Sequence, residues 1–447
     1  MSTATTTISR PQGQPMPEHD NRREKDAPLR QDIRVLGNAL GQAILRHGGP
    51  AVFDTVEQLR HNCIRLRECT EKLSHASSEE ASPLQDEIAA LTQEIAHTVD
   101  NCDLDTAIDV IRAFTAYFHL VNTAEQYHRI RRRRSHEASD SSKPQRGSLP
   151  ALINFLQTNK LDATTVQQLL DQLSIELVFT AHPTEATRRS LITKSRHIAE
   201  LLEAHDIGSV VTPRQQASWR RDLEGTIDLV WRTDAIRRVR PQLLDEIKMG
   251  IYYLNEILYD AVPDLYTEFE ELLHESYPQV SVPPFLRLGS WIGGDQDGNP
   301  FVGPDTLLTA LHLQQYHVIE HYRTTLAALA REYSQSLNHA RITPALQRSL
   351  DDDAARLPDY DHELGPQATL EPYRRKFSFM WKRLEATLSA PPPPLTSTWA
   401  SAPLEAASRP EAMSISYNSA EELLADLQLI RTSLLADGEL DLAQGEL

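Results

Sequence analysis

Two short runs of β-favouring residues, each ended by an unusual loop, restrict the possible folds of this chain most strongly. Ile175–Phe179 stops at Thr180-Ala-His-Pro-Thr184, and Phe285–Leu288 leads into Gly289-Ser-Trp-Ile-Gly-Gly and the turn-forming Asp297-Gly-Asn-Pro300. A strand that ends in a polar loop and feeds a helix is typical of parallel β/α folds. In a (β/α)8 barrel the chemistry collects where strands end and loops begin. Both loops are therefore candidate functional segments.

Most of the chain outside these runs has helical periodicity. Apolar residues recur at spacings of three and four, and they predict one buried helical face made by Ile108, Ile111, Phe114, Phe118 and Val121. A later helix is predicted to bury Leu191, Ile198 and Leu202. The chain is thus predicted to be a mainly α-helical α/β protein.

Stretches rich in Pro, Ser, Thr and charge divide the chain into segments. They predict a disordered tail (1–30), an N-terminal helical region (31–133), a mobile loop (134–149), the start of a barrel with strands near 175–180 and 285–292 (150–388), a Pro-rich loop (389–411) and a final helical segment (412–447).

The charge balance bears on the class of partner. Lys and Arg number 45 against 63 Asp and Glu, a formal net charge of −18, which argues against a nucleic-acid binder. The run Arg129–Arg134 is accordingly predicted to be a solvated or salt-bridged helix end. No apolar stretch is long enough for a bilayer, no signal peptide core is present, and the cysteines form no C-x-x-C pair. We expect a cytoplasmic protein with neither nucleic-acid nor membrane partners.

His182 stands between a strand end and a helix start, a position suited to an anion. Unpaired backbone N–H groups and the helix dipole favour phosphate or carboxylate there. His182 can exchange protons near neutral pH, and Arg188 and Arg189 add fixed positive charge. For the His-Pro-Thr triplet alone, a capping histidine with solvated arginines is the more common explanation.

The loop around Trp291 combines glycines with two aspartates, so we tested it as a metal site. Asp295 and Asp297 fit a calcium-binding loop, but Pro300 stands where that loop needs Gly and Thr306 where it needs Glu. The template fails. A structural turn is the simpler interpretation of the segment from Asp297 to Pro300.

Taken whole, the two loops resemble the signature segments of phosphoenolpyruvate carboxylases. The first is VFTAHPTEATRRSL around His182, and the second is GSWIGGDQDGNPF around Trp291. Three weaker matches, LGNALGQAI, NTAEQYHRI and WRTDAIRRVRPQLLDE, occur in the family's order. The resemblance begins near Asp32 and runs to the end of the chain, but it covers only the front of the family pattern.

The resemblance implies a reaction and a set of site residues. It implies carboxylation of phosphoenolpyruvate with bicarbonate to oxaloacetate and phosphate, with Mg²⁺ as cofactor, in a step that feeds the tricarboxylic acid cycle. It makes His182 the catalytic histidine and Trp291, Arg188 and Arg189 substrate-binding residues. Gln296 stands where the family usually has Arg, which leaves a role for that position open. An allosteric homotetramer is implied for the complete enzyme.

The later part of the family pattern carries the Mg²⁺ ligands, the catalytic lysine and the phosphate-binding loop. Neither G-R-G-G nor L-D-x-R-Q occurs in this sequence. By resemblance we therefore expect an incomplete (β/α)8 barrel with extra helices, its first two strands present, with metal ligands beyond residue 447 and no activity alone. Two alternatives remain open, namely one chain of a split carboxylase and a non-catalytic helical interaction protein.

Overall fold

The protein is seen in a computed structural model that describes residues 25–138, 144–180, 188–207, 212–234, 242–297, 299–389, 415–439 and 442. These residues are mainly α-helical, as predicted, with two β-strands. The chain divides into two compact units. Unit 1 consists of Met1–Lys160 and His182–Arg240, and unit 2 of Leu161–Ala181 and Pro241–Leu447.

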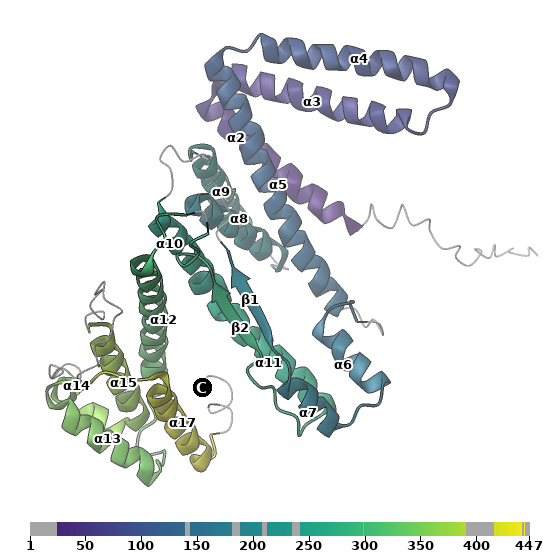
Figure 1. The fold of residues 1–447 in the computed structure, drawn as a ribbon. Helices are drawn as coiled ribbons and strands as arrows, with labels where there is room; N and C mark the ends of the chain where they lie inside the picture. The colour runs from purple at the N-terminus through teal and green to yellow at the C-terminus, as the bar shows by residue number, and fades with distance from the viewer. Residues whose placement is uncertain are drawn as a thin grey trace, which may run out of the picture. The chain divides into compact units, whose positions relative to one another are not determined.

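Unit 1 is helical. Its described helices are α2 (Ala27–His47), α3 (Gly49–Leu73), α4 (Ser78–Asp100), α5 (Leu104–Ala138), α6 (Leu149–Thr158), α8 (Arg189–Ile207) and α9 (Pro213–Trp231). Helices α3 and α4 lie side by side (Figure 1). Helices α2, α5, α8 and α9 share one apolar core, whose most deeply buried members include Leu36, Ala43, Ala124, Ile198 and Ile227. The predicted buried positions Leu191, Ile198 and Leu202 are confirmed, at 4%, 0% and 3% exposure.

The buried face of α5 was predicted wrongly in large part, although Phe114 packs against the core as expected. Ile108, Ile111 and Phe118 are 47%, 66% and 60% exposed. The face that packs into the core is formed instead by Val110, Ala113, Ala116, Leu120, Thr123, Ala124, Tyr127 and His128. Both faces repeat at helical spacing, so periodicity alone does not choose between them. The small members Ala113, Ala116 and Ala124 are 1%, 6% and 0% exposed, so neighbouring helices pack closely on this face.

Two predicted segment boundaries also change. Helix α5 continues to Ala138, so residues 134–138 are helical rather than part of a mobile loop. Ion pairs from Arg133 to Glu137 and from Arg134 to Glu203 accompany this extension, and they confirm a salt-bridged helix end. At the other end of unit 1, α2 begins at Ala27, inside the range assigned to the tail.

Unit 2 contains the strands and the remaining described helices. These are α7 (Ala163–Asp171), β1 (Ile175–Phe179), α10 (Leu243–Tyr253), the π-helix η1 (Leu254–Leu258), α11 (Tyr259–Ser276), β2 (Leu286–Ser290), α12 (Pro304–Glu332), α13 (Pro344–Arg356), α14 (Pro358–Leu370), α15 (Pro372–Ser389) and α17 (Ala420–Asp437). Its main apolar core lies among α12, α13, α15 and α17, around side chains such as Leu346, Phe377, Met380 and Leu434.

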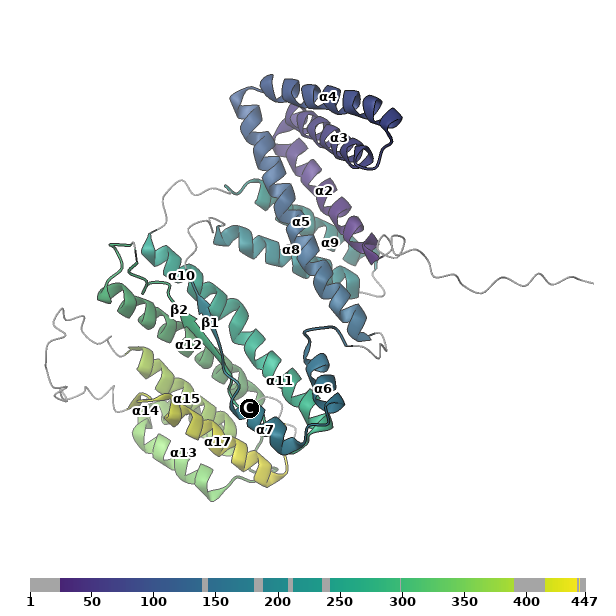
Figure 2. The ribbon, with the colours of Figure 1, turned by 45° about the vertical axis from the view of Figure 1, so that its right-hand side comes forward.

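The two strands pair in parallel, as the sequence predicted (Figures 1 and 2). The register aligns Ile175 with Leu286 and Phe179 with Ser290. No further strand occurs among the described residues, so a barrel remains a prediction. Leu177 and Val178 point to opposite faces of the sheet, and they are 49% and 48% exposed. Both faces of β1 are thus open in the described part of unit 2.

A buried ionic cluster joins three helices of unit 2. The ammonium group of Lys376 on α15 has no exposed surface, and it lies 2.7 Å from Asp353 of α13 and 2.7 Å from Asp426 of α17. Asp426 also accepts a 3.0 Å hydrogen bond from Arg383. Burial raises the pKa of the Asp353 carboxyl, although Lys376 opposes that shift. The cluster therefore fixes α13 and α17 against α15.

None of the helices in the described ranges has the combined length and apolar character needed to cross a bilayer.

Candidate active site

The carboxyl ends of β1 and β2 meet at one edge of the sheet. The backbone N–H of Trp291 donates a 2.8 Å hydrogen bond to the carbonyl oxygen of Phe179, which extends the ladder one residue beyond β2. The segment that follows β2 therefore starts beside the end of β1. Side chains placed after both strands of a parallel pair are brought together at such an edge.

Ile292 anchors the loop that carries Trp291. Its side chain packs against Ile247 and Ile251 of α10 and Ala310 of α12. The adjacent Gly293 has a φ of +83°, and a Cβ there would lie 2.8 Å from Ile247 Cγ1 and 3.0 Å from Ala310 Cβ. Glycine is required on both grounds. Ile292 and Gly293 thus fix the loop against α10 and α12.

The indole of Trp291 takes no part in this anchoring. The residue is 56% exposed although the neighbouring Ile292 is packed into the protein. Large exposed aromatic side chains on a rigidly held loop are available for ligand contact. The geometry is compatible with the substrate-binding role that the sequence predicted for Trp291.

The polar side chains of the loop build turns. Asp295 Oδ1 accepts a 3.0 Å hydrogen bond from the backbone N–H of Asp297. Asn299 Oδ1 accepts one of 3.1 Å from the N–H of Phe301. These are the local side-chain contacts by which Asp and Asn stabilise turns. They favour a structural role for these two side chains.

The described residues do not offer a metal site. None of their His, Cys, Asp and Glu side chains form a group of three or more that could hold a metal ion. Mg²⁺ is usually bound by one or two carboxylates together with waters and substrate phosphates, and the Asp295 carboxylate is engaged in its own turn. The sequence resemblance placed the Mg²⁺ ligands beyond residue 447, so these residues do not test that expectation.

The two predicted arginines lie at the start of α8 in unit 1. Arg188 donates a 3.0 Å hydrogen bond from Nη1 to the carbonyl oxygen of Asp234, just after α9. Arg189 is the first residue of α8 and is exposed. The contact of Arg188 fixes the N-terminus of α8 against the end of α9. At least one N–H group of the Arg188 guanidinium therefore has a structural role.

His182, the predicted catalytic residue, lies outside the described residues. The chain leaves β1 at Thr180, two positions before it. Of the other predicted site residues, Trp291 belongs to unit 2 and both arginines belong to unit 1. The structure thus establishes the surroundings of Trp291, Arg188 and Arg189 one unit at a time.

Sequence reasoning missed the residues that support the Trp291 loop. A Cβ at Gly250, inside α10, would lie 2.7 Å from Ile292 Cδ1, so Gly250 makes room for the anchoring side chain. A glycine within a helical pattern was the only available signal of such a packing role. Its partner follows β2, on a distant part of the chain, and only the tertiary fold reveals it.

The similarity to known proteins extends beyond the two signature loops. The phosphoenolpyruvate carboxylase family model matches residues 29–447. The phosphoenolpyruvate carboxylase of Aromatoleum aromaticum is 34% identical over 428 residues, which cover 95% of this chain and 43% of that protein. The protein of the same name from Roseiflexus castenholzii is 34% identical over 432 residues, with 96% and 43% covered. That from Azorhizobium caulinodans is 30% identical over 427 residues, with 95% and 42% covered.

The chain therefore spans less than half the length of these relatives. The matched range includes both loops and almost all the helices of units 1 and 2. Because the family match covers nearly all of its sequence, this chain belongs to the phosphoenolpyruvate carboxylase family.

Proposed function

We propose that this chain provides the N-terminal part of an enzyme that carboxylates phosphoenolpyruvate with bicarbonate, giving oxaloacetate and phosphate. The observation that carries the proposal is the meeting of the two strand ends at the Trp291–Phe179 hydrogen bond. It puts the second signature loop beside the strand that leads to His182. Family membership supports the same reaction.

The proposal treats β1 and β2 as the first strands of a (β/α)8 barrel. Four apolar residues of the sheet, Ile175, Leu177, Val178 and Leu288, are 41–49% exposed. Neighbouring strands and barrel helices would cover such side chains. In that arrangement both signature loops emerge at the catalytic face of the barrel.

In the proposed reaction a bicarbonate oxygen attacks the phosphorus of phosphoenolpyruvate, and the enolate of pyruvate leaves. The resulting carboxyphosphate breaks down to CO₂ and phosphate while His182 accepts its proton. The enolate carbon then attacks CO₂ to form oxaloacetate. Arg188 and Arg189 would stabilise the negative charge of the phosphoryl group, and Trp291 would cover the bicarbonate. No step is assigned to a metal because the described residues do not form a metal site.

The broader expectations follow the same proposal. A complete enzyme would be a cytoplasmic homotetramer under allosteric control, with a divalent cation as cofactor. The chain alone would be inactive, because the expected phosphate-binding segment is absent from its sequence.

The test compares two proteins. One is the 447-residue chain, and the other is a chimera that continues it with the remaining part of the Aromatoleum aromaticum enzyme. Each is supplied with phosphoenolpyruvate, bicarbonate and Mg²⁺, and oxaloacetate is measured by coupled reduction. We expect turnover by the chimera only. Turnover by the short chain would contradict the assignment, and a folded but inactive chimera would favour a non-catalytic interaction protein.

Within an active chimera, His182→Asn tests the proposed proton acceptor. Loss of a general base lowers the rate by about 10²–10⁴-fold. We expect oxaloacetate formation to fall by this factor while bicarbonate-dependent release of phosphate persists. The matched control is His197→Asn, which changes an exposed histidine on α8 whose Nδ1 lies 3.4 Å from Glu200. Near-normal oxaloacetate formation by His182→Asn, with a lower melting temperature, would assign His182 a capping role.

A further inference from the structure

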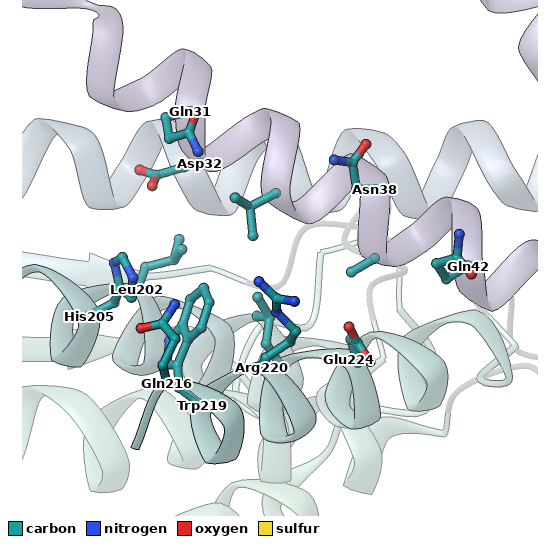
Figure 3. Close-up of a pocket in the computed structure, with 13 residues that line it drawn as sticks. Gln31, Asp32, Asn38, Gln42, Leu202, His205, Gln216, Trp219, Arg220 and Glu224 are labelled. Atoms are coloured by element: carbon teal, nitrogen blue, oxygen red, sulfur yellow. The ribbon is translucent and has the colours of Figure 1, made fainter. Parts of the chain in front are cut away.

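A pocket of about 400 Å³ opens between α2, α8 and α9, within unit 1 (Figure 3). One wall is a single face of α2, and the opposite wall is a face of α9 together with the end of α8. Its volume lies in the range of small-molecule sites. The proposed carboxylation does not use it, and neither signature loop contributes to its lining.

The floor of the pocket is apolar and well fixed. Leu202 and Leu223 are 3% and 1% exposed and lie beneath it. The ring of Trp219 packs against that of His205, with centroids 4.4 Å apart and an angle of 33° between the ring planes. The indole N–H of Trp219 donates a 2.7 Å hydrogen bond to the carbonyl oxygen of Leu201, which holds the ring in place. The floor can therefore receive an apolar group without rearranging.

Two opposite charges lie on one wall. Arg220 and Glu224 occupy adjacent turns of α9, and both line the pocket. Figure 3 shows the guanidinium of Arg220 directed from α9 toward α2. Such spacing often gives an ion pair. Within the ranges that the structure describes, however, neither side chain makes an ion pair with the other or with a third residue. Each is available to a ligand.

The rest of the lining narrows the class of ligand. Asp32 at one end is ion-paired with Arg131 at 2.8 Å, but Arg131 also pairs with Asp206, so this end of the pocket also disfavours a ligand with net negative charge. Asn38 and Gln42 present amides from α2, and amides can donate to a carboxylate or accept from an ammonium group. A dianion would be repelled by Glu224, and a simple cation would be repelled by Arg220. A ligand that carries both charges close together satisfies both residues.

We propose that this pocket binds a free α-amino acid with an apolar side chain. The α-carboxylate pairs with Arg220, and the α-ammonium group pairs with Glu224. The side chain lies on the floor formed by Leu202, Leu223 and Trp219. The proposal depends on unit 1 alone and is independent of the carboxylation chemistry.

L-Leucine and two analogues, each lacking one charged group, test this assignment by calorimetric titration of the full chain. 4-Methylpentanoate keeps the carboxylate, and isoamylamine keeps the amine. We expect L-leucine to bind at least about ten-fold more tightly than either analogue, because each charge-assisted contact has a substantial effect on affinity. Equal binding of the three compounds, or no saturable binding of L-leucine at millimolar concentration, would overturn the proposal.

Charge-neutral variants identify the contacts. In Arg220→Gln, L-leucine should bind no better than isoamylamine, and in Glu224→Gln no better than 4-methylpentanoate. Arg221→Gln is the matched control, because Arg221 is the exposed neighbour on α9 and does not line the pocket. Circular dichroism and melting curves verify that each variant is folded. A control variant that loses as much affinity as Arg220→Gln would exclude the assigned contact.

Discussion

The backbone N–H of Trp291 donates a 2.8 Å hydrogen bond to the carbonyl oxygen of Phe179. This contact ties the start of the second signature loop to the end of the strand that precedes the first. It uses only backbone atoms, and the partly buried Ile292 next to it packs against α10 and α12. The indole of Trp291 consequently does not contribute to this packing. A change of this side chain should therefore affect ligand contact rather than the stability of the loop.

Trp291→Ala should therefore leave stability almost unchanged but lower activity. The side chain is 56% exposed, so we expect a change within about 1 kcal/mol in the free energy of unfolding. In the active chimera we expect kcat/KM to fall by about ten-fold or more, which corresponds to about 1.4 kcal/mol of transition-state stabilisation. Leu229→Ala, equally exposed at 56%, is the control and should change neither quantity. Unchanged kcat/KM in Trp291→Ala would remove this residue from the proposed site.

Gly293→Ala should destabilise unit 2. The new methyl group would lie 2.8 Å from Ile247 Cγ1, at a φ of +83° that side chains disfavour. We expect a loss of about 1–3 kcal/mol, measured by urea unfolding. Gly303→Ala is the control, because a Cβ there meets nothing within 4 Å. Equal stability of the two variants would show that Ile247 and its neighbours can move to accommodate a methyl group at position 293.

Lys376→Met should be among the most damaging substitutions in unit 2. It leaves the buried carboxylate of Asp353, which is 3% exposed, and that of Asp426 without their shared cation. Removing one partner of a buried pair typically costs about 3–5 kcal/mol. The control is Arg60→Met, which breaks an exposed pair with Glu57 and should cost at most about 1 kcal/mol. Urea unfolding of both variants compares the two costs, and similar values would show that the Lys376 cluster is solvated.

Stability should decrease on mild acidification because of His128. The residue is 5% exposed, and its Nε2 lies 3.8 Å from Asp26. Burial, followed by the charge of Arg131, lowers the pKa of the His128 imidazole from 6.5. The unfolded chain therefore takes up a proton before the folded chain does. The free energy of unfolding should fall as the pH drops below 6.5 toward the lower folded-state pKa.

The pH test uses a difference between variants. Melting temperatures are measured between about pH 8 and about pH 5, where histidine usually changes charge. We expect His128→Gln to lose less stability over this range than the unmodified chain does. His197→Gln, at an exposed site on α8, should follow the unmodified chain. Parallel curves for His128→Gln and the unmodified chain would contradict a titrating His128.

The sequence by itself determined the family, the helical character and both strands. The runs at 175–179 and 285–288 have β-favouring residues and abrupt polar ends, so local chemistry was sufficient to locate β1 and β2. The two signature loops were recognisable because each extends over a dozen or so consecutive residues. These are local properties, because they depend only on residues that are neighbours in the sequence.

Only the tertiary structure decided which surfaces are covered. On α5 two faces repeat at helical spacing, and the packing of neighbouring helices selected the face with Ala113 and Ala124 over that with Ile111. The fit of Ile292 beside Gly250 and the burial of Lys376 between Asp353 and Asp426 likewise join residues far apart in sequence. Such contacts depend on the complementary shape and charge of segments that are distant in the sequence. The sequence pattern around one residue does not identify the residue that it will contact.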